Sequence, residues 1–273
     1  LHGPGWRGSV PKGMVDVPSP TRYANIAGRI LVRGPDEYAE VNALQDKLAL
    51  YRWSDWKAGR RVPAPSPAQT TADDAPAASS EAIVFFQRLG AMLRGWHPSR
   101  ADTTLLKTFP AIGLTQNDGF HPERLSPDQR AALEAGYRAG KALVAAHSLN
   151  LGVQSNGWTT NYRGPRFGND WLLRAAVAKD QIFVAIPEEA IYPVGRVDSE
   201  NRPLDGRCRY RIRFAADKLP PVDGFWSITA YGDDGFMIPN PVNRYSVGDR
   251  SPDLRRGRDG TVSILLSRTN PAD

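Results

Sequence analysis

The chain has 273 residues, of which 41% are hydrophobic and 23% charged, so it can form one large domain or two smaller ones with hydrophobic cores. No apolar run approaches the roughly 18 residues that a membrane-spanning helix needs, and we therefore expect a soluble protein without membrane insertion. The net charge of +6 would permit binding to nucleic acid. Because no nucleic-acid motif accompanies this charge, an arginine-rich soluble protein explains it better than a nucleic-acid partner does.

Cysteine and histidine usage argues against several kinds of site. Cys208 is the single cysteine, so no internal disulfide can form. The histidines lie far apart and make no metal-ligand pair such as H-x-H: His2, His97, His121 and His147. The sequence also contains no G-x-S-x-G elbow, phosphate-binding P-loop or C-x-x-C motif. We therefore expect neither a metal site nor a cofactor.

The first part of the chain is predicted to consist of strands followed by one helix. Leu1 to Val32 is rich in Gly, Pro and short apolar runs, a pattern typical of strands joined by tight turns. Gly34-Pro35-Asp36 should open the helix, because proline at the first helical position loses no hydrogen bond. Apolar residues at three- and four-residue steps predict one buried stripe through about Trp53: Val41, Leu44, Leu48 and Tyr51.

A change of composition then predicts a linker or a long surface loop at residues 59–80. This stretch is rich in Pro, Ala, Ser and Thr, and its prolines, at positions 63, 65, 67 and 76, forbid a helix. Few of its side chains could be buried.

The middle of the chain is predicted to be helical. A first helix should bury one face made of Phe85, Leu89, Met92 and Trp96. Asp102 is a candidate cap for a short second helix through Phe109. Ser126-Pro127-Asp128-Gln129 is a capping box that should start a third helix, with Gly152 as its stop. That helix carries Leu133, Tyr137 and Val144, and Asn169 or Asp170 should begin a further helix through Ala178.

The remainder of the chain is predicted to form strands. Residues 207–214 alternate between arginine and an apolar or small side chain, which is the pattern of a half-buried strand. Gly232-Asp233-Asp234-Gly235 is a turn that should fold one strand back on the next. The other candidate strands are residues 182–186, 190–197, 225–231, 236–238 and 261–266. Short connections favour antiparallel pairing, so we predict an α+β, mostly β protein with antiparallel sheets or sandwiches in two parts and a helical middle segment.

Several short blocks carry a resemblance to a known family. Those of the first part are Gly3-Pro4-Gly5-Trp6-Arg7-Gly8, Pro18-Ser19-Pro20-Thr21, Gly28-Arg29 and Leu44-Gln45. Those of the second part include Asn156-Gly157-Trp158, Phe167-Gly168-Asn169-Asp170, Pro187-Glu188-Glu189-Ala190-Ile191-Tyr192, Phe225-Trp226-Ser227-Ile228-Thr229 and Asn243-Arg244-Tyr245-Ser246. Over nearly the whole chain these blocks resemble a bacterial family that pairs two domains of unknown function, numbered 1254 and 1214.

The resemblance implies a division of the chain and a location. Residues 1–58 would be the C-terminal part of the 1254-type domain, 59–80 the linker, 81–152 a helical insert and 153–273 the 1214-type β domain. The family has further strands before the first block and beyond Pro271, so this chain resembles a form shortened at both ends that lacks edge strands or borrows them from another chain. Members often carry export signals and have no agreed enzymatic activity, which implies a periplasmic or secreted protein.

Three charged or glycine-rich patterns have a simpler explanation than a site. Gly3 to Gly8 fits G-x-G-x-x-G, but Pro11 and Gly13 prevent the helix that a dinucleotide site needs. The four arginines of residues 207–213 could bind an anion, although such a face more often lies in water. Asp198, Glu200 and Asp205 lack the order of a calcium loop and suggest a polar turn.

A set of polar and aromatic residues is the candidate ligand site, because small polar ligands and sugars are held by flat rings and a few amide, guanidinium and carboxylate groups. For catalysis we select Tyr231 or Tyr245 to transfer a proton and Arg244 to stabilise negative charge, with Asp170 or Asp249 to orient the arginine. The remaining candidates for ligand binding are Asn156, Trp158, Asn169, Arg174, Trp226 and Asn243. The structural alternative makes Trp226 a core residue, Asn169 a helix cap and Arg244 half of an ion pair with Asp170 or Asp249.

These observations lead to two functional hypotheses. The first is an exported or envelope-associated protein that binds a small polar molecule or carbohydrate, with hydrolase- or lyase-type activity in its enzymatic form. The second is a non-catalytic structural or assembly protein that forms homo-oligomers through its β domains.

Overall fold

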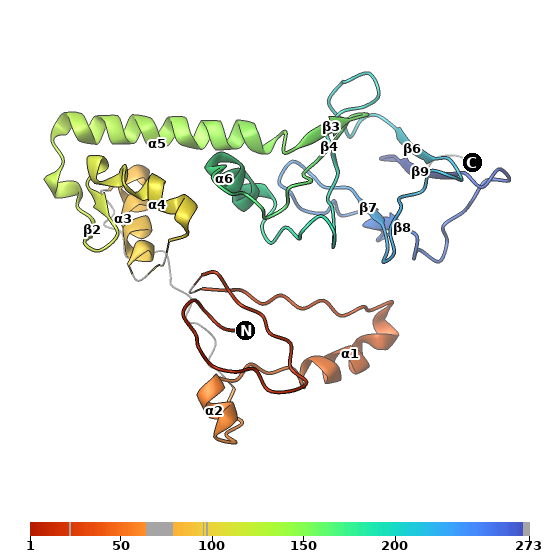
Figure 1. Cartoon of the computed structure of the whole chain (residues 1–273). Helices are drawn as coiled ribbons and strands as arrows, with labels where there is room; N and C mark the ends of the chain where they lie inside the picture. The colour runs from red at the N-terminus through yellow and green to blue at the C-terminus, as the bar shows by residue number, and fades with distance from the viewer. Residues whose placement is uncertain (22, 64–78, 95, 97, 270–273) are drawn as a thin grey trace. The chain divides into compact units, whose positions relative to one another are not determined.

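The computed structural model describes residues 1–21, 23–63, 79–94, 96 and 98–269, and it contains both helices and small antiparallel sheets (Figure 1). Helix accounts for 30% and strand for 14% of the structure, which confirms the α+β class but does not show the predicted predominance of β structure. The chain divides into two compact units. Unit 1 comprises Leu1–His147 and Phe167–Ala175, and unit 2 comprises Ser148–Arg166 and Ala176–Asp273.

The first part of unit 1 contains fewer strands and a shorter helix than predicted. Within residues 1–21 and 23–32 the backbone forms no strand, and one isolated bridge joins His2 to Pro18. The Gly-rich and Pro-rich segments therefore form turns and extended loops. A helix does begin at Pro35, as η1 (Pro35–Glu37) and then α1 (Tyr38–Gln45), and a separate short helix, α2 (Trp53–Lys57), follows.

The predicted buried stripe of this first helix is wrong. The helix ends at Gln45, so the later members of the stripe lie outside it. Leu44 is 46% exposed and Leu48 is 64% exposed. A stripe at helical spacing is buried only where another element packs against it, and no such element covers this face among the described residues. Most of the predicted linker, residues 64–78, lies outside the described residues.

The helical middle of unit 1 was predicted more accurately, because its helix ends depend on local hydrogen bonds. Its elements are α3 (Glu81–Leu93), α4 (Arg100–Leu106), η2 (Phe109–Ile112), β1 (Leu114–Thr115), β2 (Gly119–Phe120), η3 (Pro122–Arg124) and α5 (Pro127–Ser148). The capping box of α5 is confirmed: the Gln129 N–H donates to Ser126 Oγ at 3.2 Å, and the Ser126 N–H donates to Gln129 Oε1 at 2.9 Å. The cap of α4 is Ser99, whose Oγ accepts from the Asp102 N–H, so the prediction of Asp102 as the cap is wrong by three residues.

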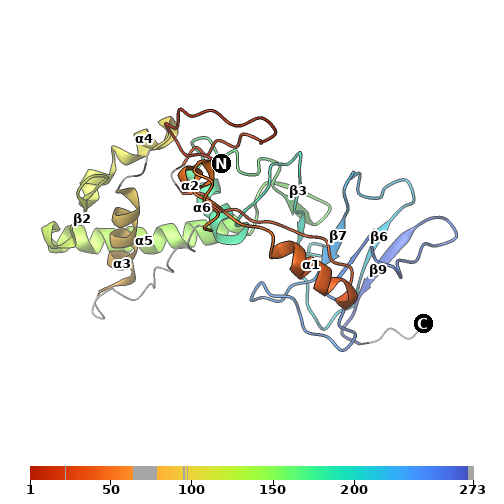
Figure 2. The same cartoon turned by 90° about the horizontal axis from the view of Figure 1, so that it is seen from below.

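A small hydrophobic core holds this helical part together. Its buried members are Ile83, Leu93, Leu114, Phe120 and Leu133. Helix α3 lies below α5 in Figure 1 and runs across it in the perpendicular view of Figure 2. Two of the four residues of the predicted face, Leu89 and Trp96, pack against this core. The other two are exposed, Phe85 to 47% and Met92 to 70%.

The described residues of unit 2 form three small antiparallel sheets. They pair β3 (Val153–Ser155), β4 (Trp158–Thr160) and β5 (Val194–Gly195); β6 (Tyr210–Phe214) and β9 (Val262–Leu266); and β7 (Ser227–Thr229) and β8 (Ser246–Gly248). The alternation of β6 is confirmed, with Arg211 and Arg213 exposed and Tyr210, Ile212 and Phe214 partly buried. The predicted strand at residues 182–186 is absent, and those at 190–197 and 225–231 are reduced to β5 and β7.

The turn at residues 232–235 also folds the chain back as predicted. The Gly232 N–H donates to the Phe236 carbonyl at 2.9 Å, and an antiparallel bridge joins Tyr231 to Met237.

The last helix, α6 (Trp171–Asp180), begins after Asp170, whose Oδ1 accepts from the Leu173 N–H at 3.0 Å. None of the described helices is both long enough and apolar enough to span a membrane.

Candidate functional site

Two of the three predicted ligand-binding residues of unit 1, Asp170 and Arg174, have structural roles at α6. Asp170 caps this helix, whereas its neighbour Asn169 is exposed and does not take the capping role. Arg174 lies within α6 and forms an ion pair with Asp102 at 2.8 Å. These three residues belong to unit 1, and the other eight predicted site residues belong to unit 2.

Three predicted residues of unit 2 lie in or beside its sheets. Asn156 has a φ of 52° and forms the turn between β3 and β4 together with Gly157. Trp158 lies over Gly195, where an added Cβ would be 3.2 Å from the indole ring. Trp226 packs against Phe214 with ring centroids 5.4 Å apart, so the alternative that it is a packing residue has structural support.

Arg244, the predicted charge-stabilising residue, has a different carboxylate partner from the two that were predicted. Arg244 forms its ion pair with Asp253, and neither Asp170 nor Asp249 takes that place. Asp249 Oδ1 instead accepts from the Trp226 N–H at 3.1 Å. The backbone of Arg244 is held by Asn240, whose Oδ1 accepts from the Arg244 N–H at 3.0 Å.

The two tyrosines and Asn243 complete the predicted set. Tyr231 is 61% exposed and Tyr245 is partly buried, and the structure gives neither phenol a hydrogen bond to Arg244. Asn243 has a φ of 48° and precedes Arg244 in an exposed turn. The convergence of all eleven residues in one cleft stays a prediction.

Two charged clusters of unit 2 are held by their own ion pairs. Arg207 pairs with Asp205 at 2.5 Å, and its hydrogen bonds lower the pKa of Asp205 to about 2. Arg213 lies 3.5 Å from Asp259, so part of the arginine face of β6 is neutralised locally. Asp198 accepts from the backbone and guanidinium of Arg202, which is the arrangement of a polar turn. These contacts favour a structural role for both clusters.

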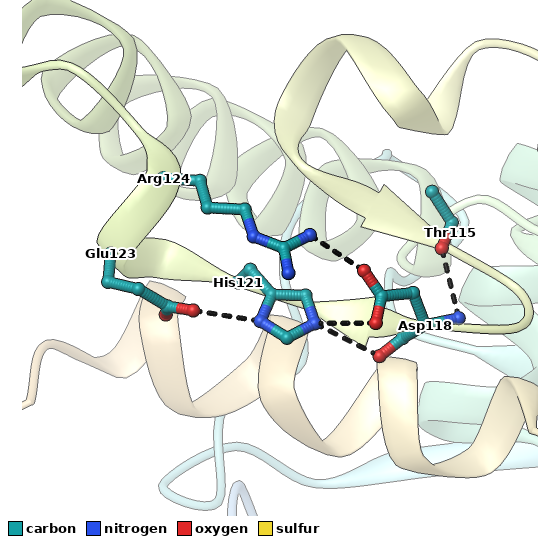
Figure 3. Close-up of polar contacts among 5 residues, drawn as sticks. All are labelled: Thr115, Asp118, His121, Glu123 and Arg124. Carbon is teal, nitrogen blue, oxygen red and sulfur yellow. Dashed lines mark hydrogen bonds and ion pairs between the residues drawn. The ribbon is translucent and has the colours of Figure 1, made fainter.

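A histidine cluster in unit 1 was not selected from the sequence. His121 Nδ1 lies 2.8 Å from Glu123 Oε1, and its Nε2 lies 3.1 Å from Asp118 Oδ1, so the imidazole bridges two carboxylates (Figure 3). Arg124 donates to the other Asp118 oxygen at 2.7 Å. The hydrogen bond with Glu123 is the largest cause that raises the pKa of His121 above 6.5. Both ring nitrogens are occupied, so the cluster ties the turn between the paired strands β1 and β2 to η3 and leaves no ring nitrogen to bind a substrate or metal.

The described residues contain no group of His, Cys, Asp and Glu that could hold a metal ion. They do contain a hollow with the chemistry that was expected of the ligand site, at another place in the chain. This hollow, of about 860 Å³, lies in the first part of unit 1 and is called the tryptophan hollow below. Its lining includes Arg7, Trp53, Trp56, Lys57 and Arg61.

Packing of aromatic rings shapes the tryptophan hollow. Trp53 and Trp56 both belong to α2, and their indole rings stack on each other, with centroids 5.3 Å apart and planes 9° from parallel. Trp6 meets Trp53 edge to face at 6.4 Å and brings the N-terminal loop to the helix. Gly8 permits this approach, because a Cβ there would lie 2.2 Å from the Trp6 ring.

The charged side chains that line the tryptophan hollow are all positive. Arg7, Lys57 and Arg61 are exposed cations, and none of them forms an ion pair with a carboxylate among the described residues. Arg61 lies 5.6 Å above the Trp56 ring and donates to the Trp56 carbonyl at 3.2 Å, which fixes its position. The nearby Asp55 is already paired with Arg60. Positive charge therefore gathers beside flat apolar rings.

The model of a family of proteins of unknown function, DUF1254, matches residues 1–52, and that of another, DUF1214, matches residues 189–273. The chain pairs a DUF1254 segment with a DUF1214 segment. This confirms the resemblance noted in the sequence. No match was found among curated proteins.

The tryptophan hollow lies at the end of the DUF1254 segment. Arg7 and Gly8 belong to that segment, and Trp53, Trp56, Lys57 and Arg61 follow it directly. The sequence contained a usable signal for this site: Trp53 and Trp56 are three residues apart, so they share one face of a helix, and Lys57 and Arg61 follow at helical spacing. The Gly-Pro-Gly-Trp-Arg-Gly block supplies the opposite wall.

Proposed function

We propose that the protein binds a small anionic carbohydrate-like molecule, such as a sugar acid, in the tryptophan hollow. The observation that carries this proposal is the presence, beside a stacked pair of indole rings, of three cations that have no carboxylate partner among the residues the structure describes. The proposal keeps the ligand class expected from the sequence and assigns it to different residues.

The two parts of such a ligand match the two parts of the hollow. The C–H faces of a sugar ring can pack against the indole rings of Trp53 and Trp56, which offer a large apolar area at a low entropic cost. A carboxylate on the ring would accept hydrogen bonds from Arg7 or Arg61, and guanidinium groups match the planar geometry of carboxylates. Lys57 adds a further positive charge.

Titration calorimetry of the whole chain with galacturonate tests the proposal. Galactose has the ring without the charge, and acetate has the charge without the ring, so both should bind more weakly than galacturonate. Arg61→Gln and Trp53→Ala should each weaken galacturonate binding about tenfold, which is the size expected for the loss of a charged hydrogen bond or of a ring contact. Binding should also fall as the salt concentration rises.

Arg29→Gln is the matched control, because Arg29 is an exposed arginine in the first part of unit 1 that does not line the hollow. It removes the same charge and should leave galacturonate binding unchanged. Equal binding of galactose and galacturonate would contradict the proposal. Equal loss in Arg29→Gln and Arg61→Gln would do the same, because it would indicate a general charge effect.

The enzymatic form of the hypothesis and the location are separate proposals. Hydrolase- or lyase-type activity, with Tyr231 or Tyr245 as the proton-transfer group and Arg244 as the stabilising cation, rests on residue types alone. An exported, envelope-associated location rests on the family resemblance. Cell fractionation followed by immunoblotting tests the second of these, and its outcome does not affect the binding proposal.

Self-association is the second candidate function, and exposed apolar side chains of unit 2 favour it. Phe236 is 73% exposed, Val242 is 77% exposed and Phe225 is 53% exposed. Strand β6 pairs on one side with β9, and its other edge has no partner strand among the described residues. Exposed apolar groups and open strand edges favour association with another chain.

Sedimentation velocity over a range of protein concentrations tests this alternative. A self-associating protein should show a mass that rises with concentration, and Phe236→Ser should shift the transition to higher concentration. A monomer at every concentration would exclude it. This result is independent of galacturonate binding, so the two candidate functions can be separated.

A further inference from the structure

A second cavity, separate from the tryptophan hollow, lies in unit 1 and has a volume of about 340 Å³. Most of its lining is apolar. The residues that form this apolar wall include Leu89, Leu93, Trp96, Leu105, Leu106 and Phe109. A volume of this size lies near the lower end of the range for small-molecule sites in proteins.

The charged part of the cavity lining is the ion pair of Asp102 with Arg174, and the hydroxyl-bearing residues Thr21 and Tyr23 also line the cavity. Asp102 is 4% exposed, and its Oδ2 accepts from Ser99 Oγ at 2.7 Å. Its Oδ1 lies 2.8 Å from Arg174 Nη1 but receives no well-directed hydrogen bond, so a buried carboxylate oxygen retains hydrogen-bonding capacity. The Arg174 side chain is 40% exposed and keeps further N–H donors.

We propose that this cavity binds a small apolar molecule with a neutral hydroxyl head group. A hydroxyl can donate to Asp102 Oδ1 and accept from Arg174, and it thereby satisfies both members of the pair. A carboxylate head would approach the buried negative charge of Asp102, and an ammonium head would approach Arg174. Each charged head would also lose its hydration in a mainly apolar cavity.

Calorimetric titration with octanol, octanoate and octylamine, which share one chain length, tests the head-group selection. Octanol should bind most tightly, about tenfold or more above either charged probe, because one hydrogen bond to a buried charged group contributes that much. Binding of octanoate or octylamine as tightly as octanol would overturn the proposal, and so would an absence of octanol binding.

Two variants locate the binding event. Leu105→Trp fills the cavity and should abolish octanol binding, whereas Leu143→Trp, at a 58% exposed position of α5 that does not line the cavity, should leave it unchanged. Asp102→Asn removes the negative charge and should bring octanoate binding closer to octanol binding. Unchanged octanol binding in Leu105→Trp would contradict the proposal.

A direct measurement keeps the test valid if Leu105→Trp does not fold. In the unaltered protein, bound octanol should give nuclear Overhauser effects between its chain protons and the ring protons of Trp96 and Phe109. Octanol that binds without these effects occupies another place, which would overturn the assignment. The result does not bear on galacturonate, because the two cavities have different linings.

Discussion

Arg174 on α6 and Asp102 on α4 form an ion pair in which one partner is buried and the other is partly exposed. The carboxylate of Asp102 also completes the capping arrangement of α4, because the Asp102 N–H donates to Ser99 Oγ at 3.2 Å while its Oδ2 accepts from the same hydroxyl. Burial raises the pKa of Asp102, but the contacts with Ser99 and Arg174 outweigh this effect, and the pKa lies below its ordinary value. Asp102 is therefore ionised at neutral pH, and its buried negative charge is stabilised by Ser99 and Arg174.

Removal of Arg174 should destabilise unit 1. Arg174→Met keeps the length of the side chain but leaves the charge of Asp102 buried without its cation. We expect a loss of about 1–3 kcal/mol in the free energy of unfolding, less than for a fully buried pair because water reaches the guanidinium. Urea denaturation measures this loss. The double variant Asp102→Asn/Arg174→Met should lose less than Arg174→Met alone, and an equal or larger loss would contradict the explanation.

Gly90 should be required for the packing of α3 on β2. A Cβ at this position would lie 2.8 Å from the Phe120 backbone nitrogen and 3.2 Å from Gly119 Cα, so Gly90→Ala must displace main-chain atoms. We expect destabilisation of about 1–3 kcal/mol from overpacking, although alanine favours helix by about 1 kcal/mol. Gly140→Ala in α5 is the control, because nothing lies within 4 Å of its Cβ, and it should be neutral or stabilising. Equal effects of the two variants in urea denaturation would exclude the packing argument.

The limits of sequence-based prediction are clear in the helical middle. Ser126 and Gln129 identified the start of α5 because a capping box forms hydrogen bonds within four residues. The buried face of α3 was identified only in part. The apolar periodicity indicated Leu89 and Trp96, which pack against the core, but also Phe85 and Met92, which are exposed. The face that is buried also depends on β2, which packs on α3 through contacts distant in the sequence.

The difference between local and distant contacts also explains why the candidate site was predicted at residues other than those of the tryptophan hollow. Residue type alone suggested a role in binding for Asn156 and Arg244, but the first forms a turn and the second is paired with Asp253. The tryptophan hollow combines Arg7 with Trp53, and no local pattern joins two segments so far apart. The predicted buried stripe included Trp53 only as its approximate end, and the repeat at Trp56 on α2, although visible in the sequence, was not selected.

The histidine cluster should make stability depend on pH near neutrality. The pKa of His121 is raised above 6.5, chiefly by its hydrogen bond with Glu123 and also by Asp118. Its contribution is therefore fully present below pH 6.5 and is lost as the pH rises through the raised pKa of the folded state. The charge of Arg124, which is paired with the same Asp118, acts in the opposite direction and lowers the pKa of His121.

Two measurements test this dependence. Thermal denaturation should show a melting temperature that falls as the pH rises above 6.5, and His121→Gln should remove the histidine-dependent part of that fall. A titration of the imidazole resonances by NMR should give a lower pKa for His121 in Glu123→Gln than in the unaltered protein. A pKa that does not respond to Glu123→Gln would show that the hydrogen bond is not the cause.

The position of Trp6 should decide the form of the tryptophan hollow. Gly8→Ala would place a Cβ 2.2 Å from Trp6 Cζ2, and the indole ring would have to leave its contacts with His2 and Trp53. We expect shifted indole N–H resonances for both Trp6 and Trp53 and weaker galacturonate binding, with little change in the helical circular dichroism of the chain. Gly28→Ala is the matched control, because nothing lies within 4 Å of its Cβ. If Gly8→Ala leaves both indole resonances in place, the N-terminal loop does not hold the rings of α2, and the wall that Arg7 contributes to the hollow is not fixed by this contact.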